Sequence, residues 1–253
     1  MEQIIRVSAV SFLNTLPFRY GLNQSEEISK HARIEYDIPS VCAQKLISGE
    51  VDVGLIPVAA LKDIPDYHII SRYCIGARDK VDSVYLFGQV PVHKMESIYL
   101  DYRSRTSAGL IRILAEEYWH TSPEWKKASP GYEKQISGKT GGLIIGDKAL
   151  ELADDFTCRY DLANIWRKFT GEEFIFAAWV SRKKLSDEFL QAFNDALEYG
   201  IKHPDKAVEA MGNKYRHLPA LDYLKNSIDY SMTDSKRKSL TLYLKKIKKL
   251  PPL

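Results

Sequence analysis

The chain has 253 residues, of which 45% are hydrophobic and 27% are charged. This composition is close to the average for globular proteins, so it excludes a wholly disordered chain, a collagen-like protein and a coiled coil. The formal net charge of +3 is too small to indicate nucleic acid as the main partner, and no apolar stretch approaches the ~20 residues that span a bilayer.

The first third of the chain alternates between patterns typical of strands and of helices. Strand patterns cover residues 4–10, 32–38, 51–56 and 68–75, and helix or turn patterns cover 14–22, 40–49 and the residues after 57. Ser40 is the expected N-cap of the helix that stops at Gly49. Strands alternating with helices predict a parallel sheet with right-handed crossovers.

The rest of the chain first repeats this alternation and then becomes helical. Strand patterns lie at 84–90, 97–101, 142–146 and 174–180, and helix patterns at 108–119, 147–152, 187–202, 204–212, 219–227 and 235–249. This order predicts an α/β protein with two lobes and a central cleft. Residues 1–85 begin the first lobe, 86–176 form an inserted second lobe, and 177–253 complete the first lobe with C-terminal helices. The expected crossings are the strands at 83–90 and 174–180.

The cysteines and histidines favour no metal or disulfide site. Cys42, Cys74 and Cys158 are odd in number and widely spaced, and the six histidines are scattered. Neither a disulfide framework nor a zinc site is therefore predicted. The N-terminal sequence has no features of a secretory signal, so we expect a cytoplasmic protein.

A polar segment follows the first predicted strand, at the edge where open α/β sheets bind their ligands. It contains Ser11 and Asn14, and the Asn14 side chain offers both a hydrogen-bond donor and an acceptor. The alternative is a turn that an Asx-type hydrogen bond stabilises.

Residues 101–107 run from a strand end into a helix start. Free N–H groups, hydroxyls and guanidinium groups together suit an anion such as a carboxylate or phosphate. The alternative is an ordinary N-cap with exposed arginines.

Two further segments lack the features of known catalytic motifs. The run 141–147, which ends in Gly146 and Asp147, is glycine-rich without the Lys-Ser/Thr of a P-loop. Ser83 has no neighbouring histidine to activate it as a nucleophile, so its expected role is hydrogen bonding. The segments together predict a site that holds a small polar anion without a nucleophile.

Several segments together resemble one enzyme family, the chorismate dehydratases of menaquinone biosynthesis by the futalosine route: SFLNTLPFRYGL, PSVCAQKLISGEVDVGLIPVAAL, DYRSRTSAGLIRIL, GGLIIGDKAL and FIFAAWV. The resemblance covers most of residues 5–180 in the expected order. It implies a fold similar to type II periplasmic binding proteins. It also implies conversion of the small-molecule substrate chorismate to 3-[(1-carboxyvinyl)oxy]benzoate and water, with no metal or organic cofactor.

The resemblance also implies roles for individual residues. Asn14 and Ser83 are the expected catalytic residues. The expected substrate-binding residues are Ser11, Ser40, Arg105, Thr106, Ser107, Gly146 and Asp147. Neither Asn14 nor Ser83 is a competent base near neutral pH, so we expect the enolpyruvyl carboxylate of the substrate to take the ring proton, with Asp147 as the rival base. Tyr102 departs from the family pattern, because many relatives carry a smaller residue there.

Two other functions also agree with these sequence features. A sister enzyme of the same pathway processes cyclic dehypoxanthine futalosine, but its opening motif reads closer to PNDTF than to FLNTLPF. A solute-binding protein that serves a transporter would share the fold, because a fold does not fix a function.

Residues 234–253 carry seven basic residues and one acid. Leu240, Tyr243, Leu244 and Ile247 follow helical spacing, so we expect one face of this helix to pack on the body while the lysines are solvated. The alternative is a contact with a membrane surface or a partner, without stable membrane insertion. The sequence does not indicate an oligomeric state.

Overall fold

The computed structural model describes residues 4–251, which divide into two compact units. Unit 1 contains the chain up to Gly76 and the segment Ile175–Thr233, and unit 2 contains Ala77–Phe174 and the chain from Asp234 onwards. Within these residues the chain passes from one unit to the other three times, once more than the sequence predicts.

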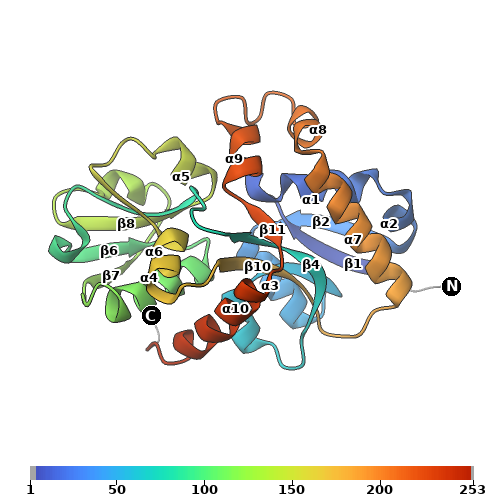
Figure 1. Ribbon diagram of the computed structural model, residues 1–253, viewed down its shortest axis with the longest axis horizontal. Coiled ribbons are helices and arrows are strands. Elements are labelled where there is room, and N and C mark those ends of the chain that lie inside the picture. The colour runs from blue at the N-terminus through green and yellow to red at the C-terminus, as the bar shows by residue number, and fades with distance from the viewer. Residues whose placement is uncertain (1–3, 252–253) are drawn as a thin grey trace. The chain divides into compact units, whose positions relative to one another are not determined.

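Unit 1 contains a six-stranded sheet with the strand order β11-β4-β10-β3-β1-β2 (Figure 1). The strands are β1 (Ile5–Val10), β2 (Ala32–Asp37), β3 (Val53–Pro57), β4 (His68–Ala77), β10 (Phe174–Ser181) and β11 (Asp229–Ser231). The predicted parallel pairing holds for β1 with β2 and with β3. Strand β10 pairs antiparallel with β3, so the sheet is mixed.

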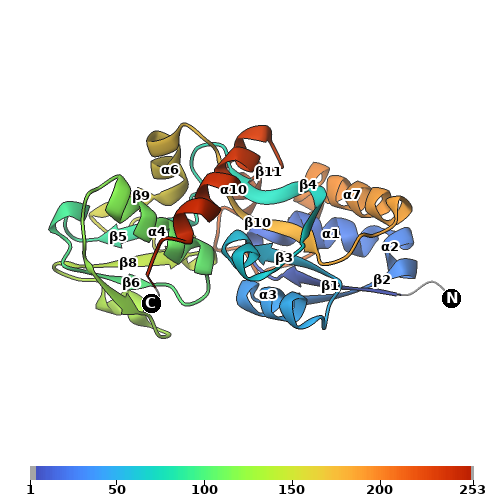
Figure 2. The same cartoon turned by 90° about the horizontal axis from the view of Figure 1, so that it is seen from below.

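Helices cover both faces of this sheet, with α3 on one side and α7 on the other (Figure 2). The helices of unit 1 are η1 (Leu13–Thr15), α1 (Leu16–Gln24), α2 (Glu26–His31), α3 (Pro39–Ser48), η2 (Val58–Asp63), α7 (Asp187–Lys202), α8 (Pro204–Glu209) and α9 (Ala220–Asn226). Because both faces are covered, all five residues of β3 are buried, and the strand is apolar throughout.

Helix α3 begins one residue earlier than its polar residues indicate. Its N-cap is Ile38 and Pro39 opens the helix, so the predicted cap Ser40 is the second helical residue. Proline is well suited to this position because its missing N–H would have no partner in the helix. The predicted stop is confirmed, since Gly49 adopts a left-handed conformation with φ of 78°.

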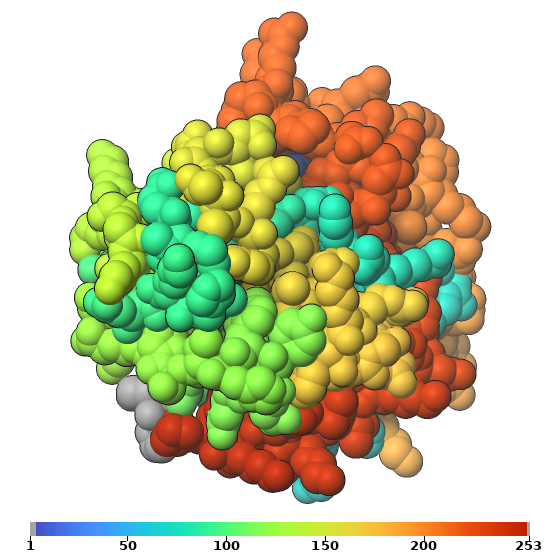
Figure 3. Space-filling model, turned by 60° about the vertical axis from the view of Figure 1, so that its left-hand side comes forward, coloured from blue at the N-terminus to red at the C-terminus, as the bar shows by residue number. Residues whose placement is uncertain are grey.

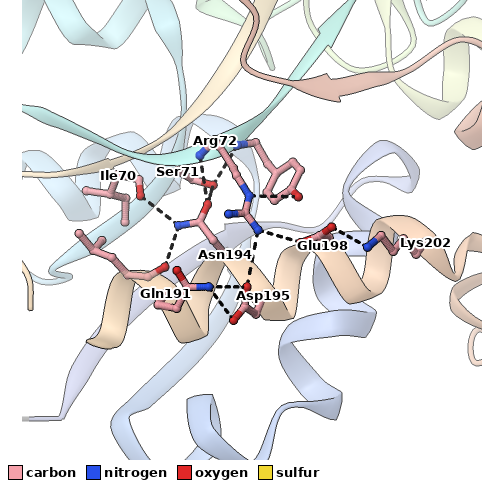
Figure 4. Close-up of polar contacts among 10 residues, drawn as sticks. Ile70, Ser71, Arg72, Gln191, Asn194, Asp195, Glu198 and Lys202 are labelled. Carbon is pink, nitrogen blue, oxygen red and sulfur yellow. Dashed lines mark hydrogen bonds and ion pairs between the residues drawn. The ribbon is translucent and has the colours of Figure 1, made fainter. Parts of the chain in front are cut away.

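A polar network fixes α7 to β4 (Figure 4). Buried Asn194 accepts hydrogen bonds at Oδ1 from Ser71 Oγ at 2.8 Å and from the Arg72 amide at 3.1 Å. Its Nδ2 donates to the Leu190 carbonyl at 2.7 Å. Arg72 Nη2 also lies 2.7 Å from Glu198 Oε2. One amide thus satisfies groups on both elements, which orients the helix on the strand.

Unit 2 contains a five-stranded sheet with the order β7-β6-β8-β5-β9. Its elements are β5 (Val84–Gly88), η3 (Val92–Lys94), β6 (Ser97–Leu100), α4 (Arg105–Glu117), β7 (Glu124–Lys127), η4 (Tyr132–Gln135), β8 (Thr140–Ile145), α5 (Asp147–Glu151), β9 (Cys158–Asp161), α6 (Leu162–Thr170) and α10 (Asp234–Ile247). Strand β6 runs parallel to β7 and β8, whereas β5 runs antiparallel to β8 and β9.

Helix α10 groups with unit 2, although the sequence places it in the completion of the first lobe. The Tyr243 hydroxyl donates to the Thr106 carbonyl at 2.9 Å, and Lys246 forms an ion pair with Glu117. Figure 3 shows α10 in red beside the green residues of α4. Its contacts with α4 therefore draw this helix into unit 2.

The predicted apolar face of α10 is confirmed. Leu240, Tyr243 and Ile247 are buried and Leu244 is half-buried. The expectation that the lysines are solvated holds for Lys245, which is exposed, but is wrong for Lys236, which is fully buried. Among residues 4–251, no helix combines the length and the apolar character needed to cross a membrane.

Helices α1 and α7 lie side by side in both ribbon views and approach closely at two glycines (Figures 1 and 2). A Cβ atom at Gly200 would overlap the Pro17 carbonyl oxygen, and one at Gly21 would overlap the Ala196 carbonyl oxygen. Both obstacles are backbone atoms in helices that the core holds in place.

We expect Gly200→Ala to lower the free energy of unfolding by roughly 1–3 kcal/mol, because the added methyl group forces the two helices apart. Ser29→Ala is the control, since Ser29 lies on an exposed helix face, where its Oγ donates to the Glu26 carbonyl. Denaturant unfolding of both variants measures the difference. A loss at Ser29 as large as that at Gly200 would contradict this account.

Candidate active site

The candidate residues of unit 1 lie at one edge of its sheet. Ser11 follows β1, and Ser40 lies just beyond the end of β2 in α3. Val10 and Asp37 are register partners, and the Ser11 amide donates to the Asp37 carbonyl at 3.0 Å. Because β1 and β2 are parallel, their carboxyl ends bring Ser11 and Asn14 to this edge, as predicted, and also bring Ser40 there.

Asn14 is the central residue of the short helix η1, and its backbone is well fixed. Thr15 Oγ1 donates toward the carbonyls of Val10 and Phe12, at 2.6 and 2.8 Å. The Tyr230 hydroxyl donates to the Asn14 carbonyl at 3.0 Å. The loop after β1 is thereby tied to β1 itself and to β11.

The side chain of Asn14 is satisfied less completely than its backbone. Its Oδ1 atom is buried, and no hydrogen-bond donor reaches it from the residues that the structure describes. Leaving a buried acceptor without a donor costs about 1–3 kcal/mol. A ligand hydroxyl or another donor would recover this energy, so Asn14 is the part of unit 1 best suited to contact a polar ligand.

Ser83 and the Gly146–Asp147 turn meet at one edge of the unit 2 sheet. Ser83 precedes β5 and Gly146 follows β8, and these antiparallel strands pair Val84 with Ile145. The Gly146 amide donates to the Ser83 carbonyl at 2.8 Å. Gly146 has φ of 67° and ψ of −150°, a conformation that essentially only glycine adopts. The turn can therefore pass close to Ser83.

The first turn of α4 belongs to the same edge, because β6 and β8 are parallel. Ser104 is the N-cap of α4, and its Oγ accepts from the Ser107 amide at 3.1 Å and donates to Ser107 Oγ at 3.0 Å. Thr106 and Ser107 are buried, and Arg105 is exposed. The N-cap of α4 thus already uses some of the hydroxyl and amide groups that the sequence suggested for binding an anion.

The buried carboxylate of Asp101 organises this edge. It accepts from Arg103 Nε at 2.9 Å and Nη2 at 2.5 Å, from the Tyr132 hydroxyl at 3.0 Å and from the Ile145 amide at 3.3 Å. The carboxylate raises the pKa of Arg103 and balances its charge. Arg105, by contrast, is exposed to solvent.

The structure thus assembles the candidate residues into two sets. Ser11, Asn14 and Ser40 belong to unit 1, and the second set, which belongs to unit 2, consists of Ser83, Arg105, Thr106, Ser107, Gly146 and Asp147. Sequence reasoning did not single out Asp101 as the residue that holds the second set, although its place after a buried strand is a recognisable signal. Among residues 4–251, no group of three His, Cys, Asp or Glu side chains is arranged to hold a metal ion.

A family model described as menaquinone biosynthesis matches residues 5–249. The chain belongs to the menaquinone biosynthesis family. A curated chorismate dehydratase from Thermus thermophilus is 24% identical over 209 residues, which cover 75% of this chain and 76% of that protein.

The fold of this family member is that of periplasmic binding proteins. A crystal structure of an Archaeoglobus fulgidus protein superposes with a TM-score of 0.76 at 16% identity, covering 96% of each chain. A Candida albicans protein described as having the generic periplasmic binding protein fold superposes with a TM-score of 0.61 at 13% identity, covering 99% of this chain and 92% of that one.

We expect Asp101→Asn to lower the free energy of unfolding by about 3 kcal/mol, because it leaves part of a buried ion pair without its counter-charge. The control is Asp154→Asn. The Asp154 side chain is 94% exposed, and its carboxylate lies 3.0 Å from Arg159. Exposed pairs of this kind contribute about 0–1 kcal/mol. Equal losses in the two variants, measured by denaturant unfolding, would show that Asp101 does not organise the edge.

Proposed function

We propose that this protein is a chorismate dehydratase that forms 3-[(1-carboxyvinyl)oxy]benzoate and water by the futalosine route of menaquinone biosynthesis. Its family and its Thermus thermophilus relative support the assignment. The structural observation that carries it is the buried Asn14 Oδ1 atom, which accepts from no donor within residues 4–251. We place the enzyme in the cytoplasm, which agrees with the lack of a disulfide among the three cysteines, all within the described residues.

The reaction needs orientation more than strong acid–base catalysis. The ring loses the proton on the carbon that carries the enolpyruvyl ether, and the pair of electrons from this C–H bond forms the new ring double bond. The hydroxyl on the adjacent carbon leaves with its bonding electrons and is protonated to water. Because the ring becomes aromatic, the elimination is strongly favourable, and holding the departing groups in register supplies much of the catalysis.

The chain's residues would divide this work among themselves. The enolpyruvyl carboxylate takes the ring proton, because neither Asn14 nor Ser83 is basic enough to do so near neutral pH. Asn14 Oδ1 accepts from a substrate hydroxyl, while its amide group and the Ser83 hydroxyl orient the carboxylate and the leaving group. Arg105 and the N-terminal turn of α4 attract a carboxylate of the substrate.

The direct test is incubation of the purified chain with chorismate, with ultraviolet absorbance and mass spectrometry to detect the aromatic enol ether. We expect turnover by the unmodified protein and a loss of roughly 10²-fold or more in Asn14→Asp, which replaces a donor with a negative charge beside the substrate carboxylate. Ser29→Ala is the control, since Ser29 Oγ donates to the Glu26 carbonyl on an exposed helix. Binding of chorismate without turnover, or turnover of cyclic dehypoxanthine futalosine instead, would refute the assignment.

A second variant identifies the base. Asp147 opens α5 next to Gly146 and is half-buried, so it is the rival to the substrate carboxylate. We expect Asp147→Asn to keep kcat within roughly tenfold of the unmodified value, whereas removal of a true general base costs roughly 10²–10⁴-fold. A loss of that size with unchanged chorismate binding would contradict proton transfer to the substrate carboxylate and would identify Asp147 as the base.

A further inference from the structure

A buried carboxylate outside the candidate set accepts hydrogen bonds from the turn that precedes Ser83. Asp161 ends β9 and caps α6, and only 7% of its surface is exposed. Its Oδ1 accepts from the amides of Ala163 and Asn164 at 3.0 and 3.1 Å, which is the ordinary function of an N-cap. Its Oδ2 has a different role, because its donors lie outside this helix.

Oδ2 of Asp161 accepts from two consecutive amides of the turn that precedes β5. The Val81 amide lies 3.0 Å away and the Asp82 amide 2.8 Å away. Asp82 adopts φ of 55°, a left-handed conformation that Asp adopts more readily than most residues other than glycine. With this conformation the two consecutive amides converge on one carboxylate oxygen.

The turn ends at Ser83, whose backbone is held from the opposite side as well. The Gly146 amide donates to the Ser83 carbonyl at 2.8 Å, and the Tyr85 hydroxyl donates to Asp82 Oδ1 at 2.8 Å. Antiparallel pairing of β5 with β9 places Tyr85 opposite Asp161. Asp161 thus ties the turn to β9 and α6 through two backbone amides. Asn164 of α6 makes a second contact with the same segment, because its Nδ2 donates to Asp79 Oδ1 at 2.5 Å. Loss of the Asp161 carboxylate would therefore loosen the turn at Val81 and Asp82.

We propose that Asp161 is a positioning residue that fixes the hydroxyl of Ser83 for catalysis through the Val81 and Asp82 amides. This inference rests on the proposed dehydratase function, since it concerns the placement of one of its catalytic residues. Asp161 itself is buried behind the turn and acts through the backbone. A 1 Å displacement of a positioned group is enough to lower a rate by roughly 10²-fold.

The protonation state of Asp161 provides a test of this role, because a residue that only caps α6 would not change the pH dependence of kcat. Burial raises its pKa from the ordinary value of 3.8 to about 6, against the backbone amides that favour the ionised form. The negative charge of Asp82 raises the pKa of Asp161 further. Tyr85 of β5 faces Asp161 across the strand pair. The positive charge of Arg159 in β9 acts on Tyr85, whose pKa it lowers. Below about pH 6 the carboxyl carries a proton, and the protonated oxygen can no longer accept both amides equally well.

Stability and turnover therefore respond to this group in opposite directions. Its pKa in the folded protein lies above that of the unfolded chain, so its favourable contribution to stability is complete below about pH 4 and is lost as the pH rises through about 6. Turnover should show the reverse, because the ionised form is the one that holds the turn.

The experiment compares Asp161→Asn and Asp161→Ser with the unmodified protein. Serine is a good N-cap but is too short to reach Val81 and Asp82, so it retains the cap on α6 and removes the contact with the turn. We expect kcat to fall roughly 10²-fold in both variants with little change in KM. The acid limb of the kcat profile near pH 6 should disappear, and amide hydrogen exchange should accelerate at Val81 and Asp82.

The control is Ser186→Ala, which removes the N-cap of α7 in unit 1, where Ser186 Oγ accepts from the Phe189 amide at 3.2 Å. It should lose stability while kcat and its pH profile stay unchanged. Unaltered kcat in Asp161→Ser, with an active unmodified enzyme, would overturn the inference and leave the proposed function standing. If the unmodified protein does not dehydrate chorismate, the proposed function is wrong. Unchanged amide exchange at Val81 and Asp82 in the Asp161 variants would separately show that Asp161 does not hold the turn.

Discussion

Buried backbone N–H groups need acceptors, and in unit 2 this need decides how the loops around the candidate residues are built. Asp101 supplies an acceptor to the Ile145 amide, and Asp161 supplies one to Val81 and Asp82. Each carboxylate joins a strand end to a loop that is remote in sequence. The loops that carry Ser83 and Gly146 are therefore shaped by two buried carboxylates.

This arrangement bears on how the protein attracts an anionic substrate. Asp101 and Asp161 add negative charge beneath the candidate residues, and the Asp101 carboxylate balances Arg103. In the proposed function, attraction for a carboxylate would come from Arg105, which is exposed, and from the N-terminal end of α4, whose dipole favours negative charge. Global net charge says little here, because a small anion responds to the donors within a Debye length of it.

Sequence patterns predict the regular elements of this chain well and its long-range contacts poorly. The bounds 187–202 match α7, because the helix has a clear apolar period and a serine N-cap. Strand β7 has the sequence EWKK at the edge of its sheet, so it lacks the apolar pattern on which strand prediction depends. Asp161 lies 80 residues from Val81, and nothing in the local sequence of either residue indicates the contact.

The candidate site likewise has features that the sequence predicts and features that it does not. The strand–loop order predicts that Ser11 and Asn14 lie at a sheet edge, but the unsatisfied Oδ1 of Asn14 depends on packing around the loop and emerges only from the structure. The Oδ1 atom of Asn14 is also relevant to the choice between an enzyme and a solute-binding protein, because both occur with this fold. A binding protein gains by satisfying its ligand fully in the ground state. An enzyme accelerates a reaction only through contacts that strengthen in the transition state. In the proposed dehydratase, an asparagine would suit an elimination in which a hydroxyl becomes water, because its side chain could accept from the hydroxyl in the ground state and donate to it as negative charge develops.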